Sequence, residues 1–421
     1  MPVESTQTGE LTLGGVGVSE LAHAYGTPLF VIDTTVLDAN VARFAQAAQR
    51  FDIDVAYAGK ALLFVALAKR LVPTPLKLDV CSLGEIVTAE RAGFPAERLV
   101  FHGCGKTDEE LDAAAAARVG RVVIDHPDEL IALGARVSAA RPLDVCLRVN
   151  TGVVAQTHAY VRTGGEDSKF GFGLDAVESA IAQTQATPGL RLVGIHSHIG
   201  SQIFEAPAFA ANLVAALDVY ALALWAGAPM RDLLIGGGFG VDAIAERVGF
   251  DVPAVLGELR ALLNHESALR SFAPPRLGIE PGRAIIATAG TSLYRVVTAK
   301  RQGARHFVIV DGGITDNPRP ALYNAYHHPR LASRHSSAPE IETTICGRAC
   351  ENDQLVVAPM PCDLRAGDLL TFGTTGAYTF AMASNYNRFP RPAAVFAGSG
   401  RHRLVVRRED AADLLARDDA G

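Results

Sequence analysis

A lysine stands directly after the first apolar run of the chain, in YAGKAL (57–62). If that run is a buried strand, Lys60 projects from the strand's end, where a desolvated amine has a lowered pKa and is able to form a Schiff base. Most lysines are solvated surface residues, so this position becomes informative only beside other reactive residues.

Two later motifs offer groups for an anion and for a cationic ring. GGGFG (236–240) presents backbone N–H groups free of side chains, which suits an anion, although a plain turn explains it equally well. It is not a dinucleotide fingerprint, because the first strand-to-helix turn has no GxGxxG. EPGR (280–283) places Glu280 before Arg283, and a surface ion pair is its simplest interpretation. Together with Lys60, however, a carboxylate that keeps a pyridine nitrogen protonated is what a pyridoxal cofactor requires.

HSHIGSQ (196–202) carries two histidines that face the same side of a strand. Two ligands are too few for a metal, and no third His or acidic ligand is evident nearby, so we expect no metal site. The alternative is an imidazole packed on a flat ring, followed by Gly200 and Ser201 as phosphate donors.

The elements that position these groups are short apolar runs, each followed by a break and then a helical pattern. Eight such runs occur: 54–60, 77–82, 98–103, 121–125, 144–150, 191–200, 232–240 and 276–283. Runs rich in Val, Ile and Leu that alternate with helices indicate buried parallel strands, and eight units predict a (β/α)8 TIM barrel. Lys60, His198, GGGFG and EPGR all fall at the C-terminal ends of these runs, which is the catalytic face of such a barrel.

After about residue 285 the segments become rich in β-strand patterns, such as HFVIVDGG (306–313) and DQLVVAP (353–359). A second, mostly β domain is also expected because 421 residues exceed what one core usually organises. We therefore predict a pyridoxal-binding barrel at 31–285 and a β-rich C-terminal domain at 286–421, which residues 1–30 complete; GELTLGGV (9–16) is a further candidate strand.

Composition excludes several classes of protein. The balance of 39 basic and 45 acidic residues gives a net charge of −6, with no basic stripe to suggest nucleic acid. No uncharged apolar run approaches about 18 residues, so we expect no membrane span. The N-terminus lacks the pattern of a signal peptide, and six cysteines are too sparse for a disulfide scaffold. These features predict a cytoplasmic protein.

The motifs together resemble the diaminopimelate decarboxylase family, within the wider group of alanine-racemase-like pyridoxal enzymes. The resemblance spans about residues 25 to 395, nearly the whole chain. It rests on ten motifs in the expected order: YAGKA, DVCSLGE, FHGCGKTDEEL, TGGEDSKFG, HSHIGSQ, GGGFG, EPGR, DGGITDNPRPALYNAYH, CGRACENDQL and GAYTFAMASNYN.

The resemblance implies pyridoxal 5'-phosphate as cofactor and assigns residues around it. Lys60 matches the Schiff-base lysine, His198 the residue that stacks on the ring, and Glu280 the partner of the pyridine nitrogen. Residues that match the surroundings of the phosphate are Ser201, Gly238, Gly282, Arg283 and Tyr378.

The resemblance also implies substrate contacts and a homodimer with shared active sites. Residues that match substrate binders are Arg283, Arg319, Tyr323, Glu351 and Tyr378. Cys350, the candidate proton donor, and Glu351 match a pair that the partner subunit contributes. Without the family context, a buried apolar cysteine and an ordinary core tyrosine would explain Cys350 and Tyr323.

The implied reaction is decarboxylation of meso-diaminopimelate to L-lysine. Alternatives are decarboxylation of a related substrate, such as ornithine or lysine of either hand or a carboxylated natural-product intermediate, and a non-catalytic pyridoxal-binding or regulatory protein. Three departures from the family concern the substrate: Arg388 and Phe389 stand where Ser-Arg is usual, and Arg348 stands where a smaller residue is usual.

Overall fold

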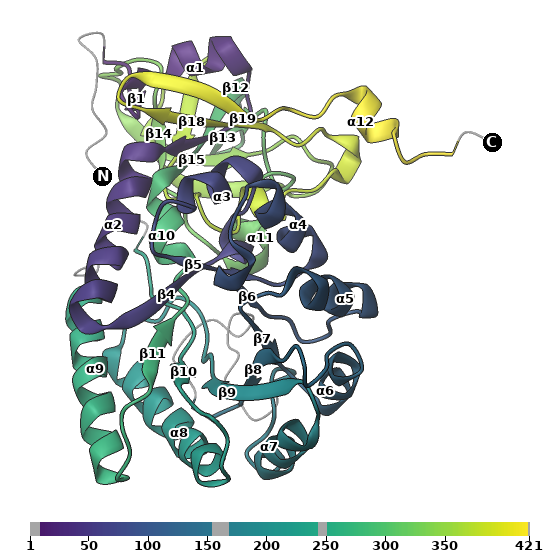
Figure 1. The fold of residues 1–421 in the computed structure, drawn as a ribbon. Coiled ribbons are helices and arrows are strands. Elements are labelled where there is room, and N and C mark those ends of the chain that lie inside the picture. Colours follow the sequence, from purple (N-terminus) through teal and green to yellow (C-terminus); the bar gives the residue numbers. More distant parts are fainter. Residues whose placement is uncertain (1–8, 154–167, 243–250, 420–421) are drawn as a thin grey trace. The chain divides into compact units, whose positions relative to one another are not determined.

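The structure of the protein, a computed structural model, describes residues 9–153, 168–242 and 251–419. They form two compact units (Figure 1). The described residues of the barrel unit lie within 41–240 and 249–284, and those of the sheet unit lie within 1–40, 241–248 and 285–421. The chain passes from one unit to the other inside two helices, α2 (Thr34–Phe51) and α10 (Arg283–Ile286).

Eight parallel strands of the barrel unit close on themselves, which confirms the predicted (β/α)8 barrel. Each of the eight predicted runs overlaps one of them. In chain order they are β4 (Ile53–Ala58), β5 (Lys77–Val80), β6 (Leu99–Phe101), β7 (Arg121–Ile124), β8 (Leu143–Arg148), β9 (Leu190–His196), β10 (Asp232–Leu234) and β11 (Arg276–Ile279). Closure occurs between β11 and β4, whose registers pair Leu277 with Ile53.

The barrel interior is filled by small and branched side chains, and helices cover its outside. One interior cluster takes a residue from each of six strands: Ala56, Val100, Val123, Cys146, Val193 and Leu234. The covering helices seen in Figure 1 are α3 (Val65–Leu71), α4 (Leu83–Arg91), α5 (Asp108–Ala117), α6 (Pro127–Gly134), α7 (Val177–Ala186), α8 (Ala206–Trp225) and α9 (Val252–Leu269). Two of these helices begin at N-cap residues: Ser82 caps α4, and Thr107 forms a capping box with Glu110 at α5.

The helix α8 is more apolar than the sequence analysis expected. By length and composition alone it could cross a membrane, the one helix among the described residues that meets this criterion. Half of it is buried, and it packs against β9, β10, α7 and α9, as a covering helix of the barrel does. Its one charged residue, Asp218, is exposed and bonds to Arg270 Nη2 at 2.6 Å.

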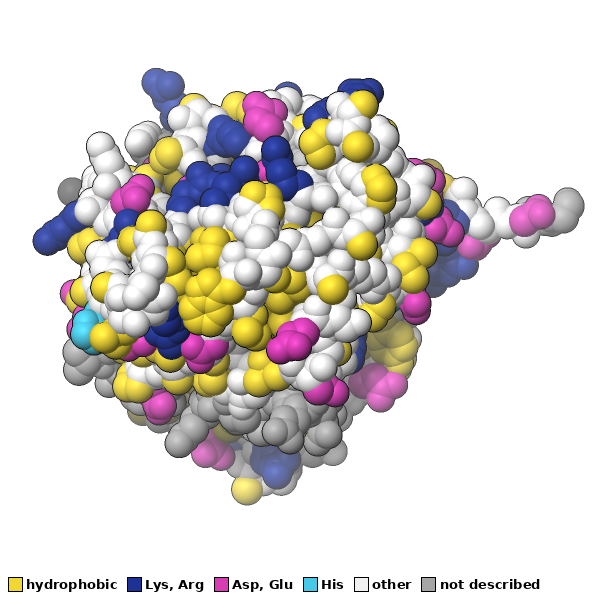
Figure 2. Space-filling model, turned by 60° about the horizontal axis from the view of Figure 1, so that its bottom comes forward, with side chains coloured by type: hydrophobic (Ala, Val, Ile, Leu, Met, Phe, Trp, Pro, Cys, Tyr) yellow, Lys and Arg dark blue, Asp and Glu magenta, His cyan; other side chains and the backbone are white. Residues whose placement is uncertain are grey.

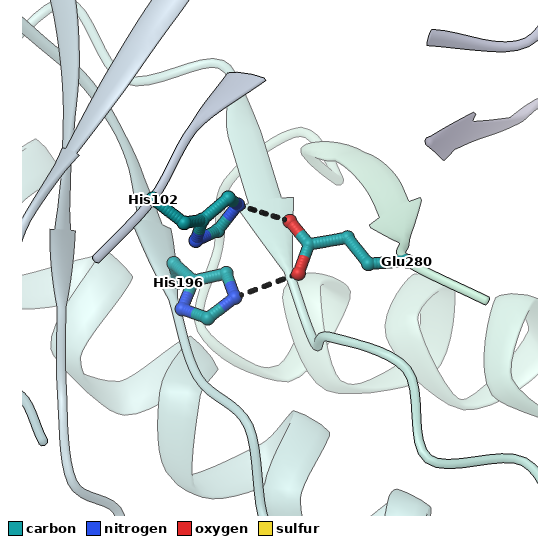
Figure 3. A group of neighbouring side chains, drawn as sticks. All are labelled: His102, His196 and Glu280. Atoms are coloured by element: carbon teal, nitrogen blue, oxygen red, sulfur yellow. Dashed lines mark hydrogen bonds and ion pairs between the residues drawn. The ribbon is translucent and has the colours of Figure 1, made fainter. Parts of the chain in front are cut away.

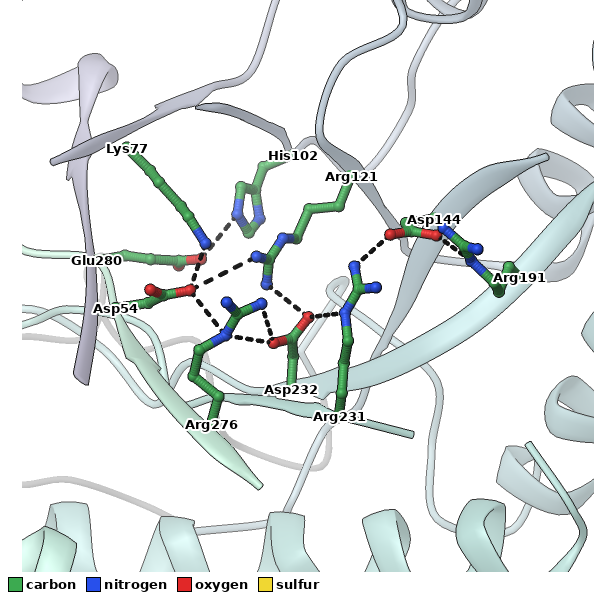
Figure 4. A network of polar contacts seen from close by, with 10 residues as sticks. All are labelled: Asp54, Lys77, His102, Arg121, Asp144, Arg191, Arg231, Asp232, Arg276 and Glu280. Carbon is green, nitrogen blue, oxygen red and sulfur yellow. Dashed lines mark hydrogen bonds and ion pairs between the residues drawn. The ribbon is translucent and has the colours of Figure 1, made fainter. Parts of the chain in front are cut away.

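Charged side chains form a network where the barrel strands begin. Figure 4 draws it together with His102 and Glu280, which follow the opposite ends of their strands. Asp232 is its centre: the side chain is 1% exposed, Oδ1 lies 2.7 Å from Arg276 Nη2, and Oδ2 lies 3.2 Å from Arg121 Nη1 and from Arg231 Nε. Burial would raise the pKa of Asp232, but Arg121 and Arg276 outweigh it and lower the pKa. The network therefore ties β7, β10 and β11 together through a buried carboxylate.

The sheet unit contains a nine-stranded sheet with the order β16-β15-β13-β12-β3-β18-β19 and two strands off that path. Its strands are β3 (Leu29–Asp33), β12 (Gly290–Gln302), β13 (Arg305–Val310), β14 (Pro329–Leu331), β15 (Glu340–Cys346), β16 (Gln354–Pro361), β17 (Leu369–Phe372), β18 (Ala393–Gly398) and β19 (Arg401–Val406). The N-terminal strand β3 lies between β12 and β18, so the sheet cannot form from the C-terminal part alone.

Short elements complete this unit. The segment GELTLGGV contains two two-residue strands, β1 (Thr12–Leu13) and β2 (Val16–Gly17), which pair only with each other. The helices are α1 (Val18–Tyr25), α11 (Arg319–Tyr323) and α12 (Ala411–Leu415). Two apolar clusters form its core, one around Leu21, Val31 and Leu293, the other around Tyr294, Val308 and Phe372.

The charge network generates a stability prediction. Asp232→Ala removes the buried carboxylate that pairs with three arginines, among them the buried Arg121. It should lower the free energy of unfolding by about 3 kcal/mol, as measured by chemical denaturation. Asp218→Ala, which removes an exposed ion pair of the same unit, should cost less than about 1 kcal/mol. Equal losses from both changes would show that the network does not stabilise the barrel.

Candidate active site

Reactive side chains gather at the C-terminal ends of the barrel strands. Lys60 follows β4 in a single turn (Gly59–Ala61), His102 directly follows β6, His196 ends β9, and Glu280 directly follows β11. Arg148 ends β8 and Asp79 lies in β5. Because the strands are parallel and the barrel is closed, these residues meet at one mouth even though they are far apart in the sequence.

Glu280 is held by two imidazoles (Figure 3). Its Oε1 lies 2.9 Å from His102 Nε2, and its Oε2 lies 3.0 Å from His196 Nε2. The side chains of Glu280 and His196 are 7% and 2% exposed. Burial alone would raise the pKa of Glu280, but His102 and His196 outweigh it and hold the pKa well below its usual value. Burial lowers the pKa of His196 to about 4. At neutral pH the group is therefore a carboxylate anion with a neutral imidazole at His196.

His198 lies beside the glycine-rich turn that follows β10. Gly237 N–H points to His198 Nδ1 at 3.3 Å, so Nδ1 is an acceptor and the ring carries its proton on Nε2. Burial, followed by the nearby Lys60, lowers the pKa of His198 well below its ordinary value. The neutral ring that results is suited to packing on a flat ligand.

Side chains are excluded from this turn by its surroundings. A Cβ on Gly237 would lie 2.1 Å from the carbonyl oxygen of Glu280, and one on Gly238 would lie 2.2 Å from that of Gly200. Gly238 also has a φ of 99°, which side-chain-bearing residues rarely adopt. The turn therefore presents bare backbone, as an anion-binding loop requires.

EPGR is fastened to the strand that carries Lys60. Ala58 N–H donates to the carbonyl oxygen of Pro281 at 3.2 Å, and a Cβ on Gly282 would lie 2.9 Å from that of Ala61. Arg283 Nη2 donates to Ser201 Oγ at 3.2 Å. The structure thus joins the predicted residues Gly282, Arg283 and Ser201 to the turn around Lys60. Lys60 itself is exposed to solvent, whereas the sequence analysis expected a desolvated amine.

One predicted motif lies partly outside the described residues. TGGED (163–167) is not described, while Phe170 and Gly171 of the same motif are. Arg148 lies over the Phe170 ring at 4.4 Å from its centroid, and Gly171 N–H donates to Asp125 Oδ2 at 3.1 Å.

The sheet unit gathers three predicted substrate residues. Arg319 begins the short helix α11 and is 6% exposed. Its guanidinium carbon lies 5.1 Å from the centroid of the Tyr323 ring and 5.8 Å from that of Tyr378. The guanidinium of Arg319 therefore lies beside two tyrosine rings, in positions that allow cation–π contacts.

Cys350 and Glu351 lie in the exposed loop between β15 and β16. Tyr386 Oη donates to Glu351 Oε1 at 2.7 Å, and Cys350 N–H donates to Asn387 Oδ1 at 3.1 Å. The buried carboxylate of Asp353 accepts from Ala349 N–H at 3.1 Å, which fixes the loop from within.

Two departures from the family pattern are in contact. The guanidinium of Arg348 lies over the Phe389 ring, with 4.3 Å between its central carbon and the centroid. Arg388 points elsewhere, since its Nη2 lies 2.6 Å from Asp418. A positive charge therefore remains next to position 389, supplied by Arg348.

The sequence motifs predict no role for His102. They also predict no metal site, because no third ligand is evident near His196 in the sequence. That reason does not hold: His102, His196 and Glu280 place three candidate ligand atoms within 4.8 Å of one another. Both carboxylate oxygens are engaged by imidazole nitrogens at hydrogen-bond distance, so the contacts define an imidazole–carboxylate clamp. The signal that could have identified His102 is its position immediately after a predicted strand, the same as that of Lys60.

Comparison with known proteins gives consistent matches. Residues 37–287 match the model of the pyridoxal-dependent decarboxylase family, pyridoxal binding domain. The chain is 45% identical over 417 residues to the diaminopimelate decarboxylase of Actinosynnema pretiosum subsp. auranticum, covering 98% of this chain and 93% of that protein. It is 39% identical over 423 residues to that of Bacillus subtilis (strain 168), covering 98% and 96%. The solved structure of diaminopimelate decarboxylase from M. jannaschii in co-complex with L-lysine is similar with a TM-score of 0.92 and 29% identity, covering 100% and 98%.

Proposed function

Since the chain belongs to the diaminopimelate decarboxylase family of pyridoxal-dependent decarboxylases, we propose that it converts meso-diaminopimelate to L-lysine and carbon dioxide. The observation that carries the proposal is the anionic Glu280, which is buried at the barrel mouth. Its EPGR motif is hydrogen-bonded to β4, the strand that Lys60 follows. The relative from M. jannaschii, whose structure holds L-lysine, supports the product.

The donor set fits pyridoxal phosphate. Its aldehyde needs an amine, its pyridine nitrogen an anion, and its phosphate a bare backbone turn with a cation. Lys60, Glu280, the turn at Gly237 and Gly238, and Arg283 supply these in one unit. A cation in place of Glu280 would not fit, because it would repel a protonated ring nitrogen.

Bound pyridoxal phosphate supplies an electron sink for the pair of electrons left when the carbon–carboxylate bond breaks. In the proposal, Lys60 attaches the cofactor, Glu280 keeps a proton on the pyridine nitrogen, and His198 packs on the ring. Ser201, Gly238, Gly282, Arg283 and Tyr378 hold the phosphate. Cys350 or Lys60 returns a proton to the α-carbon. The residues thus orient the breaking bond and place charges.

For the far end of the substrate, we assign the distal carboxylate to Arg319, Tyr323 and Arg283, with Tyr378 adjoining, and the distal ammonium to Glu351. Arginine pairs bidentately with a carboxylate, and the two rings already orient Arg319.

The proposal includes a homodimer in which the partner subunit supplies Cys350 and Glu351. Support comes from the exposure of both residues in a loop that nevertheless has fixed hydrogen bonds. Figure 2 shows one face of the molecule, on which hydrophobic side chains gather beside basic ones. A cytoplasmic location is part of the proposal as well, supported by six cysteines that are all free. We place the domain division at 31–285 and at 286–421 with 1–30. The barrel strands, from Ile53 to Ile279, lie within the first range, while β3 and the residues up to 40 belong to the sheet unit.

The first prediction concerns the attachment of the cofactor. Borohydride treatment of the purified holoenzyme should fix pyridoxal phosphate on Lys60, as shown by peptide mass spectrometry. Lys60→Ala should abolish the label and the activity, whereas Lys69→Ala should change neither. A label on a different lysine would refute the assignment.

The second prediction concerns the shared site. Lys60→Ala and Cys350→Ala variants should each be inactive and should regain part of the activity when subunits are mixed and exchanged, because some hybrid sites carry both residues. Persistent inactivity of mixtures whose subunits are shown to exchange would contradict the homodimer with shared sites.

The third prediction concerns the substrate. Arg319→Ala should reduce kcat/KM for meso-diaminopimelate by about ten- to a hundredfold, since a charge-assisted hydrogen bond contributes roughly 1.5–3 kcal/mol. Any activity on lysine, which has no distal carboxylate, should change little, and Arg301→Ala, at the exposed end of β12, should be neutral. A wild type that prefers ornithine or lysine, with a rate unaffected by Arg319→Ala, would favour a related substrate instead.

A further inference from the structure

We propose that His102 is a positioning residue that keeps Glu280 oriented and anionic toward the pyridine nitrogen of the cofactor. This inference rests on the proposed function, because it requires a cofactor at the barrel mouth.

The geometry shows that two elements besides its own strand hold the carboxylate. His102 comes from the end of β6 and His196 from the end of β9, while Glu280 follows β11 (Figure 3). The two rings are edge to face, with centroids 4.8 Å apart and planes at 65°. Each ring reaches a different carboxylate oxygen through Nε2, at 2.9 Å and 3.0 Å. Because a carboxylate only accepts, each imidazole must carry its proton on Nε2.

The choice of histidine has an electrostatic consequence. A lysine or arginine at position 102 would orient Glu280 equally well but would cancel its charge. An imidazole donates a hydrogen bond through Nε2 without the permanent charge of a lysine or an arginine. A carboxylate can accept about four hydrogen bonds, so two remain for the N–H of a protonated ring.

Other titratable groups surround the imidazole–carboxylate clamp. The titratable groups that face the clamp from neighbouring strands are Lys60 (after β4), Asp79 (β5), Arg148 (β8) and His198 (after β9). Asp79 Oδ1 lies 3.9 Å from His102 Nε2. Asp79 is fully buried, and its burial raises its own pKa. His102 thus lies between two buried carboxyl groups, and its removal would leave Oε1 of Glu280 buried without its imidazole donor.

A matched pair of substitutions isolates the donated hydrogen bond. In His102→Gln the amide nitrogen takes approximately the place of Nε2, whereas in His102→Asn it falls short, near the place of Nδ1. His265→Gln on the exposed surface of α9 is the control. The readouts, taken on the holoenzyme, are the affinity for pyridoxal phosphate and the pH titration of the bound cofactor's absorbance.

His102→Asn should weaken cofactor binding about ten- to a hundredfold and should shift loss of the ring-nitrogen proton to lower pH. His102→Gln should stay close to the wild type. If His102→Asn does not fold, His102→Leu takes its place.

Wild-type affinity and titration in His102→Asn, with only a lower melting temperature, would overturn the inference. Unfolding of both His102→Asn and His102→Leu while His102→Gln folds would also overturn it, since either result assigns His102 a purely structural role. Failure of the wild type itself to bind pyridoxal phosphate at Lys60 would instead overturn the proposed function.

Discussion

Closure of eight short parallel strands is the constraint on which the rest of the candidate site depends. Lys60, His102, His196 and Glu280 are spread over 220 positions of the chain and share no local segment. They meet because each stands at the C-terminal end of a strand and because β11 pairs with β4. The hydrogen bond from Ala58 to Pro281 continues that pairing into the loops and ties the EPGR motif to the end of the strand that Lys60 follows.

The buried carboxylates at the two ends of the barrel have different partners. At the strand starts Asp232 is surrounded by arginines, so its charge is neutralised and serves to hold strands together. At the mouth Glu280 receives imidazole donors, and the pKa of one of them, His196, lies near 4. Both oxygens of that carboxylate accept from imidazole nitrogens rather than from guanidinium groups, an arrangement suited to a cationic ring. The network around Asp232 thus stabilises the barrel at one end of the strands, while the candidate active site around Glu280 lies at the other end.

Much of this arrangement could be predicted from the sequence, because strand patterns are local. The eight apolar runs and the reactive residues at their ends predicted the barrel and placed Lys60, His198 and Glu280 at its mouth. His102 was missed because its position after a strand is not enough to assign a role; that role depends on Glu280, 178 residues away. The central place of β3 was missed for a similar reason, since LFVID resembles any buried strand and its partners lie at the far end of the chain. The substitutions at Arg348 and Phe389 were noticed singly, and only the structure shows that they stack.

The most direct test of the account is the stoichiometry of the reaction with meso-diaminopimelate. Purified holoenzyme should release carbon dioxide and L-lysine in equal amounts from this substrate, as measured by trapped carbon dioxide and by chiral chromatography of the product. It should act on ornithine and lysine far more slowly. Release of carbon dioxide from ornithine or lysine, with meso-diaminopimelate left intact, would contradict the account.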